Sequence, residues 1–225
     1  MSNFLKIFAF LSSLLSVSAF AEDLSSATDP LPPNTFTTSQ HSDEWKIKNA
    51  LAAGTPVVTE HAAVQDWADE TQKKQGKMMG RILRPGNNGW TCMPDIPGRP
   101  QHDPMCVDET MMKALTAIAA GKKAHIDKVG TSYMLLGEAR EGQNVFPTTK
   151  DPTQVKEWTL VGPHVMIVLP DSDTAALKGI NQDMSNNMPY TTVLNPNSPL
   201  PIWVIPVAKG GERIERTKVV EPPAA

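Results

Sequence analysis

Apolar residues recur at helical spacing in two stretches of the chain. Residues 108–123, DETMMKALTAIAAGKK, begin with Asp108 as a helix-capping residue and carry an apolar stripe made of Met111, Met112, Leu115, Ile118 and Ala119. Residues 42–54, SDEWKIKNALAAG, begin with the capping residue Ser42 and stop at Gly54, which favours the end of a helix. The pattern therefore predicts two main helices.

Short apolar runs bounded by proline, glycine or asparagine predict strands. AAVQDWA (62–68) and MMGRILRP (78–85) flank a polar turn and predict a hairpin. Four further runs follow: TSYMLL (131–136), HVMIVLP (164–170), YTTVL (190–194) and PIWVIPV (201–207). The turn sequence NPNSP joins the last two into a second hairpin. We expect an α+β domain, richer in sheet than in helix.

The first residues have the three parts of a secretory signal peptide. Lys6 is followed by the apolar run Ile7–Val17 and by a small-x-small cleavage site that ends at Ala21. The run is shorter than the roughly 20 apolar residues that a membrane span needs. The pattern predicts cleavage after Ala21 and a periplasmic or secreted protein with no stable membrane span.

The rest of the chain divides by composition. Residues 22–41 are rich in serine, threonine and proline, which predicts a flexible leader. Residues 42–210 hold the predicted elements and are expected to form one domain. Residues 211–225 end in EPPAA and are expected to be a loose tail.

Charge argues against nucleic acid as a partner. The chain carries 21 basic and 24 acidic residues, for a formal net charge of −3, and removal of Lys6 with the signal peptide makes it −4. Basic residues form no run of five or more. Nucleic-acid binding draws on concentrated positive charge, which this sequence lacks.

The only two cysteines, Cys92 and Cys106, lie in GWTCMPDIPGRPQHDPMC, residues 89–106. Secretion into an oxidising compartment and an even count favour one disulfide. Closing a loop of about 15 residues stabilises a fold by about 3 kcal/mol in the chain-entropy model. The spacing differs from the C-x-x-C of redox pairs, so a structural bridge is the first expectation.

The same loop suggests a metal site as an alternative. Met93 and Met105 stand beside the cysteines, and His102 lies between them. Thioether sulfur selects Cu(I), and imidazole can complete such a site. Methionine also fills irregular cores, so both interpretations of these residues stay open at this point.

A second alternative is a hydrolase built around His164. This histidine begins an apolar strand, and a general base at a strand end needs a carboxylate or a nucleophile within reach. Carboxylates are numerous, and the chain offers Asp95, Asp103, Glu138, Asp171 and Asp173. The G-x-S-x-G and H-E-x-x-H motifs are absent from the sequence. More often, a histidine at such a position only hydrogen-bonds a nearby loop.

Four strings of the chain carry a resemblance to a known group of proteins. They are NGWTCMPD, DPMCVDE, Tyr133-Met134-Leu135 and GPHVMIV. In these strings and their order, residues 45–208 resemble a family of uncharacterised secreted bacterial proteins that share a GWTCMPD…PMC block and a GPHVMI strand; PIWVIPV fits the family's last strand only in outline. The resemblance implies that the cysteine block and the GPH strand form the core, with leader and tail accessory. It implies no activity.

The sequence therefore predicts a soluble periplasmic or secreted module that binds an unidentified envelope or extracellular partner. The alternatives are a hydrolase that uses His164 and a copper-binding protein that uses Met93, His102 and Met105. Whether the chain is an enzyme stays open, with the balance against it.

Overall fold

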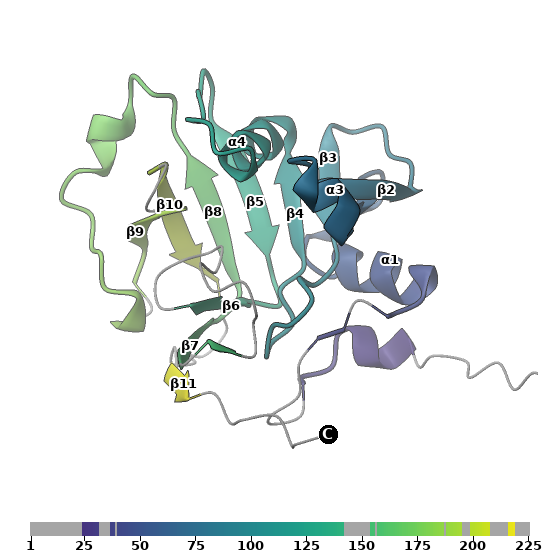
Figure 1. Cartoon of the computed structure of the whole chain (residues 1–225). Coiled ribbons are helices and arrows are strands. Elements are labelled where there is room, and N and C mark those ends of the chain that lie inside the picture. Colours follow the sequence, from purple (N-terminus) through teal and green to yellow (C-terminus); the bar gives the residue numbers. More distant parts are fainter. Residues whose placement is uncertain are drawn as a thin grey trace, which may run out of the picture.

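Eight strands form one mixed sheet in a computed structural model that describes residues 24–31, 37–38, 40–141, 154–155, 157–186, 188–194, 199–207 and 216–218 (Figure 1). The strand order is β2-β1-β3-β4-β5-β8-β10-β9. The bounds are β1 Ala63–Trp67, β2 Met79–Arg84, β3 Trp90–Met93, β4 Met105–Asp108, β5 Gly130–Met134, β8 His164–Val168, β9 Tyr190–Val193 and β10 Pro201–Pro206. β1 and β3 run parallel, and the other neighbours are antiparallel.

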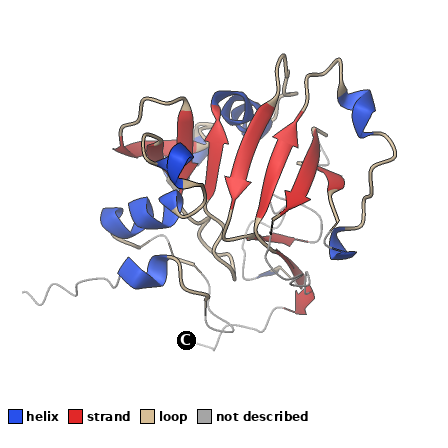
Figure 2. Cartoon of the chain, turned by 180° about the vertical axis from the view of Figure 1, so that it is seen from behind, coloured by secondary structure: helices blue, strands red, loops and turns tan. Residues whose placement is uncertain are grey.

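Two helices cover opposite faces of this sheet. Successive strand residues point to opposite faces, so Cys92 and Met93 of β3 face different layers. Helix α1 (Asp43–Leu51) packs its Ala50 against the cysteines. Helix α4 (Glu109–Ala119) packs on the other face, where Figure 2 shows it behind the strands. β3 and β4 are therefore buried on both faces, which positions the loop between them firmly.

The layer under α4 is rich in methionine. Buried members of this core include Met93, Met105, Met111, Met134 and Met166. Met93 pairs with Met105 across β3 and β4, and Met134 pairs with His164 across β5 and β8. Unbranched thioether side chains adapt to the uneven spacing between a twisted sheet and a helix. Their positions are those of packing residues.

A second sheet, in the order β11-β7-β6, lies beside the end of the first one. It is made of β6 (Glu138–Glu141), β7 (Glu157–Val161) and β11 (Arg216–Lys218). Short helical turns complete the structure: η1 Leu24–Ala27, α2 Pro56–Thr59, α3 Glu70–Lys74, η3 Thr174–Leu177 and η4 Met184–Asn186. Among the described residues, no helix is long and apolar enough to cross a membrane.

The expected α+β domain with two main helices is confirmed. Both capping predictions hold, because the side chains of Ser42 and Asp108 accept the backbone N–H of Trp45 and Met111. Both predicted hairpins are present as the antiparallel pairs β1–β2 and β9–β10. The polar turn at 69–76 differs, since it contains α3, whose start is a reciprocal capping box of Asp69 and Gln72.

Five strands escaped prediction from the apolar pattern, namely β3, β4, β6, β7 and β11. β11 lies within residues 211–225, which were expected to be a loose tail, and pairs with β7. β3 and β4 have only four residues each and adjoin the prolines of the cysteine loop. β6 has the sequence EARE, whose charged side chains indicate an exposed segment. In the structure Glu138 and Arg140 form an ion pair inside the protein, and this pairing offsets the free-energy cost of burying the two charges.

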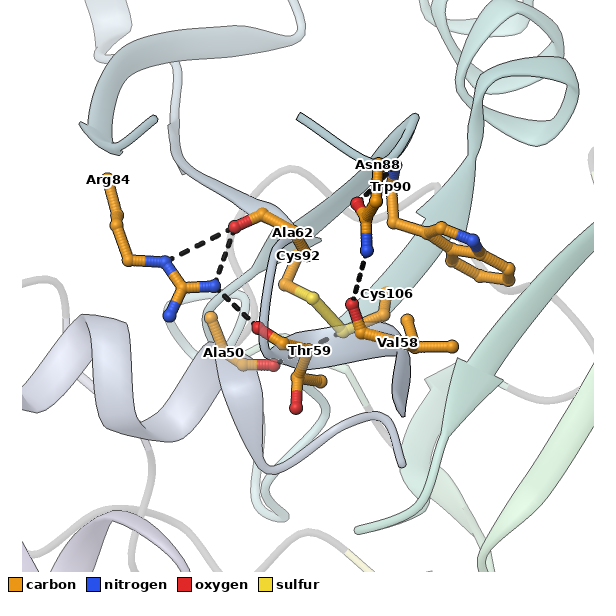
Figure 3. The surroundings of a disulfide bond; sticks show 9 residues. All are labelled: Ala50, Val58, Thr59, Ala62, Arg84, Asn88, Trp90, Cys92 and Cys106. Carbon is orange, nitrogen blue, oxygen red and sulfur yellow. Dashed lines mark hydrogen bonds between the residues drawn. A yellow bond between two sulfur atoms is a disulfide. The ribbon is translucent and has the colours of Figure 1, made fainter. Parts of the chain in front are cut away.

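The predicted disulfide between Cys92 and Cys106 is present. The two residues are direct partners on β3 and β4, with their Cα atoms 4.0 Å apart. Figure 3 shows the bridge beside the end of α1, where Cys106 Sγ lies 3.6 Å from the carbonyl oxygen of Ala50. Nearby, Arg84 donates to the carbonyl oxygens of Thr59 and Ala62 at 2.6 Å each. The bridge thus belongs to the core between α1 and the sheet.

Residues 24–31, within the stretch expected to be a flexible leader, pack against the domain. Ala27 is completely buried, and its carbonyl oxygen accepts the side-chain N–H of Asn49 at 2.9 Å. Ser26 Oγ accepts the indole N–H of Trp45 at 3.1 Å. A polar segment of this kind is held by hydrogen bonds rather than by apolar area, which composition alone does not reveal.

Removal of the bridge is expected to weaken the fold. The double variant Cys92→Ala/Cys106→Ala should lose about 3 kcal/mol of unfolding free energy, because the unfolded chain regains the freedom of a loop of about 15 residues. Guanidinium chloride denaturation measures this loss. Mass spectrometry without reductant should show the native chain lighter than its reduced form by two hydrogens. Two free thiols in the native chain would contradict the bridge.

Candidate functional site

The loop between β3 and β4, residues 94–104, holds a cluster of buried charged side chains. Asp95, Arg99, His102 and Asp103 are each at most 5% exposed. Charged groups are rarely buried unless they are paired and hydrogen-bonded. The loop is therefore built around internal polar contacts, although its sequence suggests an exposed connection.

His102 and Asp95 form the central pair of this loop. Nδ1 of His102 lies 2.5 Å from Oδ2 of Asp95. Burial alone would lower the pKa of His102, but the hydrogen bond and the negative charge of Asp95 outweigh it and raise that pKa above its usual value. With the carboxylate as acceptor, Nδ1 carries the proton. Backbone hydrogen bonds to Asp29 and Ser26 act on the pKa of the ring in the same direction as Asp95.

Backbone and amide groups hold the pair in place. Oδ1 of Asp95 accepts the backbone N–H of Asp103 at 3.0 Å, and Oδ1 of Asp103 accepts that of Ile96 at 2.8 Å. Asn49 of α1 accepts the backbone N–H of Asp95 at 2.8 Å and donates to Ala27 at 2.9 Å. These bonds join the loop to α1 and to the N-terminal segment, so the His102 ring has a defined orientation.

Arg99 ties the far side of the loop to the second sheet. Its Nη1 donates to the carbonyl oxygen of Ala139 in β6 and lies 3.6 Å from Oδ2 of Asp103. The guanidinium also lies over the Trp158 ring, 5.6 Å from its centroid. Burial raises the pKa of Asp103 well above its usual range, and the charge of Arg99 opposes this rise.

A cavity of about 550 Å³ lies beside His102, and we call it the His102 cavity. Its walls come from residues 28–31, from residues 100–102 of the loop, from the β5–β6 turn and from residues 160–163. The lining is largely leucine, valine and proline, with Leu31, Leu136 and Leu160 among its members. A cavity of this size and lining is typical of small-molecule sites.

Gln101 joins two walls of the His102 cavity. Its side-chain N–H group donates to the carbonyl oxygens of Leu136 at 3.1 Å and Val161 at 3.2 Å. Gly137 follows in a left-handed conformation, with φ of 84°, and a Cβ there would lie 2.3 Å from Gln101 Nε2. The close approach of Gln101 to this turn therefore requires glycine at position 137.

A second cavity, of about 360 Å³, lies on the other side of the pair. Asp95 lines it, together with Trp45 and Trp67. Lys46 and Asp66, also in its wall, form an ion pair of 2.7 Å. The indole N–H of Trp67 donates to the carbonyl oxygen of Pro94 at 2.7 Å. The Asp95–His102 pair therefore has one member in the wall of each cavity.

His164 belongs to a different buried cluster. Its Nε2 lies 3.3 Å from Oε1 of Glu138, and its Nδ1 lies 2.8 Å from the carbonyl oxygen of Gly162. Arg140 forms an ion pair with the same carboxylate. Burial would raise the pKa of Glu138, but the charge of Arg140 and the hydrogen bond from His164 outweigh it and hold the pKa at about 2.

The structure thus brings His164 to a carboxylate, as the hydrolase hypothesis requires, but in a closed setting. His164 is 0% exposed and Glu138 is 1% exposed. Both ring nitrogens face protein acceptors, so neither is available to a nucleophile or a substrate. Ser132 shares this face of the sheet and pairs with Met166, next to His164 along β8. The arrangement is that of a buried ion-pair network joining the two sheets.

The three residues of the copper hypothesis lie in different surroundings. Met93 and Met105 pack in the core under α4. His102 instead belongs to the layer of α1, where it contacts Asn49 and lies 6.0 Å, centroid to centroid, from the Trp45 ring. Within the part of the chain that the structure describes, His, Cys, Asp and Glu side chains form no group of three or more suited to a metal ion.

Comparisons of the chain with protein-family models, with curated proteins and with solved structures find no match. The resemblance to a family of secreted bacterial proteins therefore stays a prediction. What the chain does has to be inferred from its own geometry.

Sequence reasoning identified His102 but assigned it a different role. It also named Asp95 among many carboxylates without pairing the two. The six residues between them contain two prolines and a glycine, which bend the chain back on itself and bring the side chains together. The signal that the sequence did offer was the presence of Asp95 and His102 in one loop, with a cysteine on either side that could form a disulfide.

Asp95→Asn should lower the pKa of His102, because the neutral amide removes the charge that stabilises the imidazolium. In the wild type, the raised pKa means that stability from this pair is complete below the usual histidine pKa and is lost as pH rises through the folded-state value. An NMR titration of the His102 ring measures the change. Asp171→Asn, at the exposed His125–Asp171 pair, is the matched control and should leave the His102 pKa unchanged. An unaltered His102 pKa in Asp95→Asn would contradict the assignment.

Glu138→Gln should destabilise the protein by about 3–5 kcal/mol, because Arg140 would remain buried without its counter-charge. The wild type should also lose stability as pH falls from the usual glutamate pKa towards about 2, since only the unfolded state takes up a proton there. Urea denaturation across acid pH measures both effects. Glu44→Gln, at an exposed carboxylate of α1, is the control, and an equal response of the two variants would refute the network.

Proposed function

We propose that the chain is a periplasmic or secreted binding module, and that its ligand site is the His102 cavity. The observation that carries the proposal is the position of His102 in the wall of a cavity of about 550 Å³. The ring is held by Asp95 and by backbone hydrogen bonds to Asp29 and Ser26. A fixed polar side chain in the wall of a largely apolar cavity is the usual arrangement of a small-molecule site.

The rigidity of the walls supports binding. Three separate bonds join the wall segments: Asn49 to Ala27, Gln101 to Leu136 and Gln101 to Val161. A site formed before the ligand arrives spends little free energy on ordering its walls, which favours affinity. The disulfide at the base of the loop contributes to the same rigidity.

The chemistry of the lining favours binding over hydrolysis. Thr28 is the only hydroxyl side chain among the described residues that line the His102 cavity, and its Oγ1 donates to the carbonyl oxygen of Ser25. The two cysteines are joined to each other, so neither offers a thiolate. His102 has an orienting carboxylate, and the hydroxyl of nearby Ser26 accepts the indole N–H of Trp45.

The disulfide supports the proposed location. Bridges persist in oxidising compartments, which include the periplasm and the extracellular medium. This agrees with the signal peptide predicted for residues 1–21, which lie outside the described residues. A chain that stays unfolded in the reducing compartment where it is made, and folds after export, would form the observed bridge in the oxidising compartment.

Filling the cavity tests the proposed site. Leu136→Trp places an indole in the His102 cavity and should abolish binding of small apolar molecules found by NMR screening of the wild type. Met188→Trp is the matched control, because Met188 is an exposed apolar residue outside this cavity and the change should leave binding intact. Thermal unfolding confirms that both variants fold. A screen without hits, or hits that survive Leu136→Trp, would exclude this cavity as the ligand site.

A further inference from the structure

We infer that the second cavity, on the Asp95 side of the loop, binds one neutral sugar ring. We call it the Trp67 cavity. The inference goes beyond the proposed function, because it assigns a separate site with a different class of ligand. It follows from an apolar surface in the cavity wall, from an ion pair beside that surface, and from the balance of charges around the cavity.

Trp67 supplies an apolar surface with a fixed position. The indole lines the cavity and packs against the core under α4. Its N–H donates to the carbonyl oxygen of Pro94 at 2.7 Å, so the ring has only carbon and π surface left to offer a ligand. Ala68, Pro94 and Pro97 extend the apolar part of the wall. The negative face of an aromatic ring attracts slightly positive C–H hydrogens, such as those on one face of a sugar ring.

The pair of Lys46 and Asp66 supplies hydrogen-bonding groups in the same wall. Nζ of Lys46 lies 2.7 Å from Oδ2 of Asp66, and the two side chains are 14% and 16% exposed. The ammonium has three N–H donors, and Asp66 is its only hydrogen-bond partner in the described part of the chain. Oδ1 of Asp66 accepts the backbone N–H of Trp67 at 2.9 Å, which fixes the pair beside the indole. Donors and acceptors therefore stand side by side, as neighbouring hydroxyl groups of a sugar require.

The charges around the Trp67 cavity are already balanced, which argues against an ionic ligand. Of the six charged side chains among the described residues that line it, two form the pair just described. Two more form the pair of Lys73 with Glu70, at 2.8 Å. The remaining two are Asp95, which His102 engages, and Asp69, which caps α3. A charged ligand would compete with these contacts, whereas a neutral ligand adds hydrogen bonds without separating any pair.

The size of the Trp67 cavity suits a single ring. Its volume of about 360 Å³ is near the lower end of the range for small-molecule sites. Thr38, whose side chain is exposed, adds a hydroxyl group to the wall. A compact ligand with one apolar face and several hydroxyl groups thus matches the cavity in size, surface and charge.

Neutral and charged sugars with the same ring test the inference. The probes are glucose, galactose and mannose, each compared with its amino sugar and its uronate. In an NMR titration of the wild type, at least one hexose should shift the indole N–H signal of Trp67 and bind more tightly than both of its charged analogues. The methyl glycoside of that hexose identifies the source: retained binding would support the inference with the end of a glycan as ligand, and lost binding would support it with a free sugar.

Two variants locate the binding. Lys46→Gln should weaken the hexose by about tenfold, because it removes a charged donor. Lys113→Gln, at an exposed lysine of α4 outside the cavity, is the matched control and should bind as the wild type does. Thr38→Trp fills the cavity from an exposed position and should abolish binding, whereas Thr116→Trp, at an exposed threonine of α4, should not. Thermal unfolding checks that each variant folds, and the wild-type titration stands without them.

The outcomes separate this site from the His102 cavity. Leu136→Trp, which fills the His102 cavity, should leave hexose binding intact. A Trp67 signal that no hexose shifts, or tighter binding of an amino sugar or a uronate than of its hexose, would overturn the inference. Hexose binding that survives Thr38→Trp and is lost in Leu136→Trp would overturn it as well. The proposed function does not depend on these results, because its test uses apolar molecules in the other cavity.

Discussion

The antiparallel pairing of β3 with β4 is the constraint on which the rest of the structure depends. It places Cys92 opposite Cys106, so the covalent bridge and the sheet hydrogen bonds enforce the same register. α1 and α4 bury the pair of strands from opposite sides. The prolines between the strands then leave few conformations for the loop. In this setting an eleven-residue connection acts as part of the core, and its charged side chains are positioned as firmly as those of a strand.

Two buried ionic clusters use this framework differently. Glu138, Arg140 and His164 satisfy one another at the junction of the two sheets, where their role is to hold the sheets together. Asp95 and His102 are equally buried, but His102 lies in the wall of a cavity. Burial and a nearby carboxylate, which both histidines have, do not distinguish them.

The sequence predicted the elements whose cause is local and missed those whose cause is distant. The caps and apolar stripe of α4, and the hairpin of β9 and β10, follow from neighbouring residues. β6 reads EARE and becomes a buried strand only because Arg140 meets Glu138 inside the fold. The pairing of Asp95 with His102 likewise depends on how the loop bends, which spacing alone does not specify. The ordered contacts of residues 24–31 depend on acceptors that only the folded α1 presents.

The position of the bridge also bears on when, relative to disulfide formation, the protein could bind a ligand. The wall that carries His102 belongs to the loop that the disulfide closes, so cavity and crosslink form together. If the chain is exported unfolded, as the proposed location implies, it has no assembled cavity while its thiols are reduced. Under the proposed function, it would then bind its ligand only in the compartment where it folds.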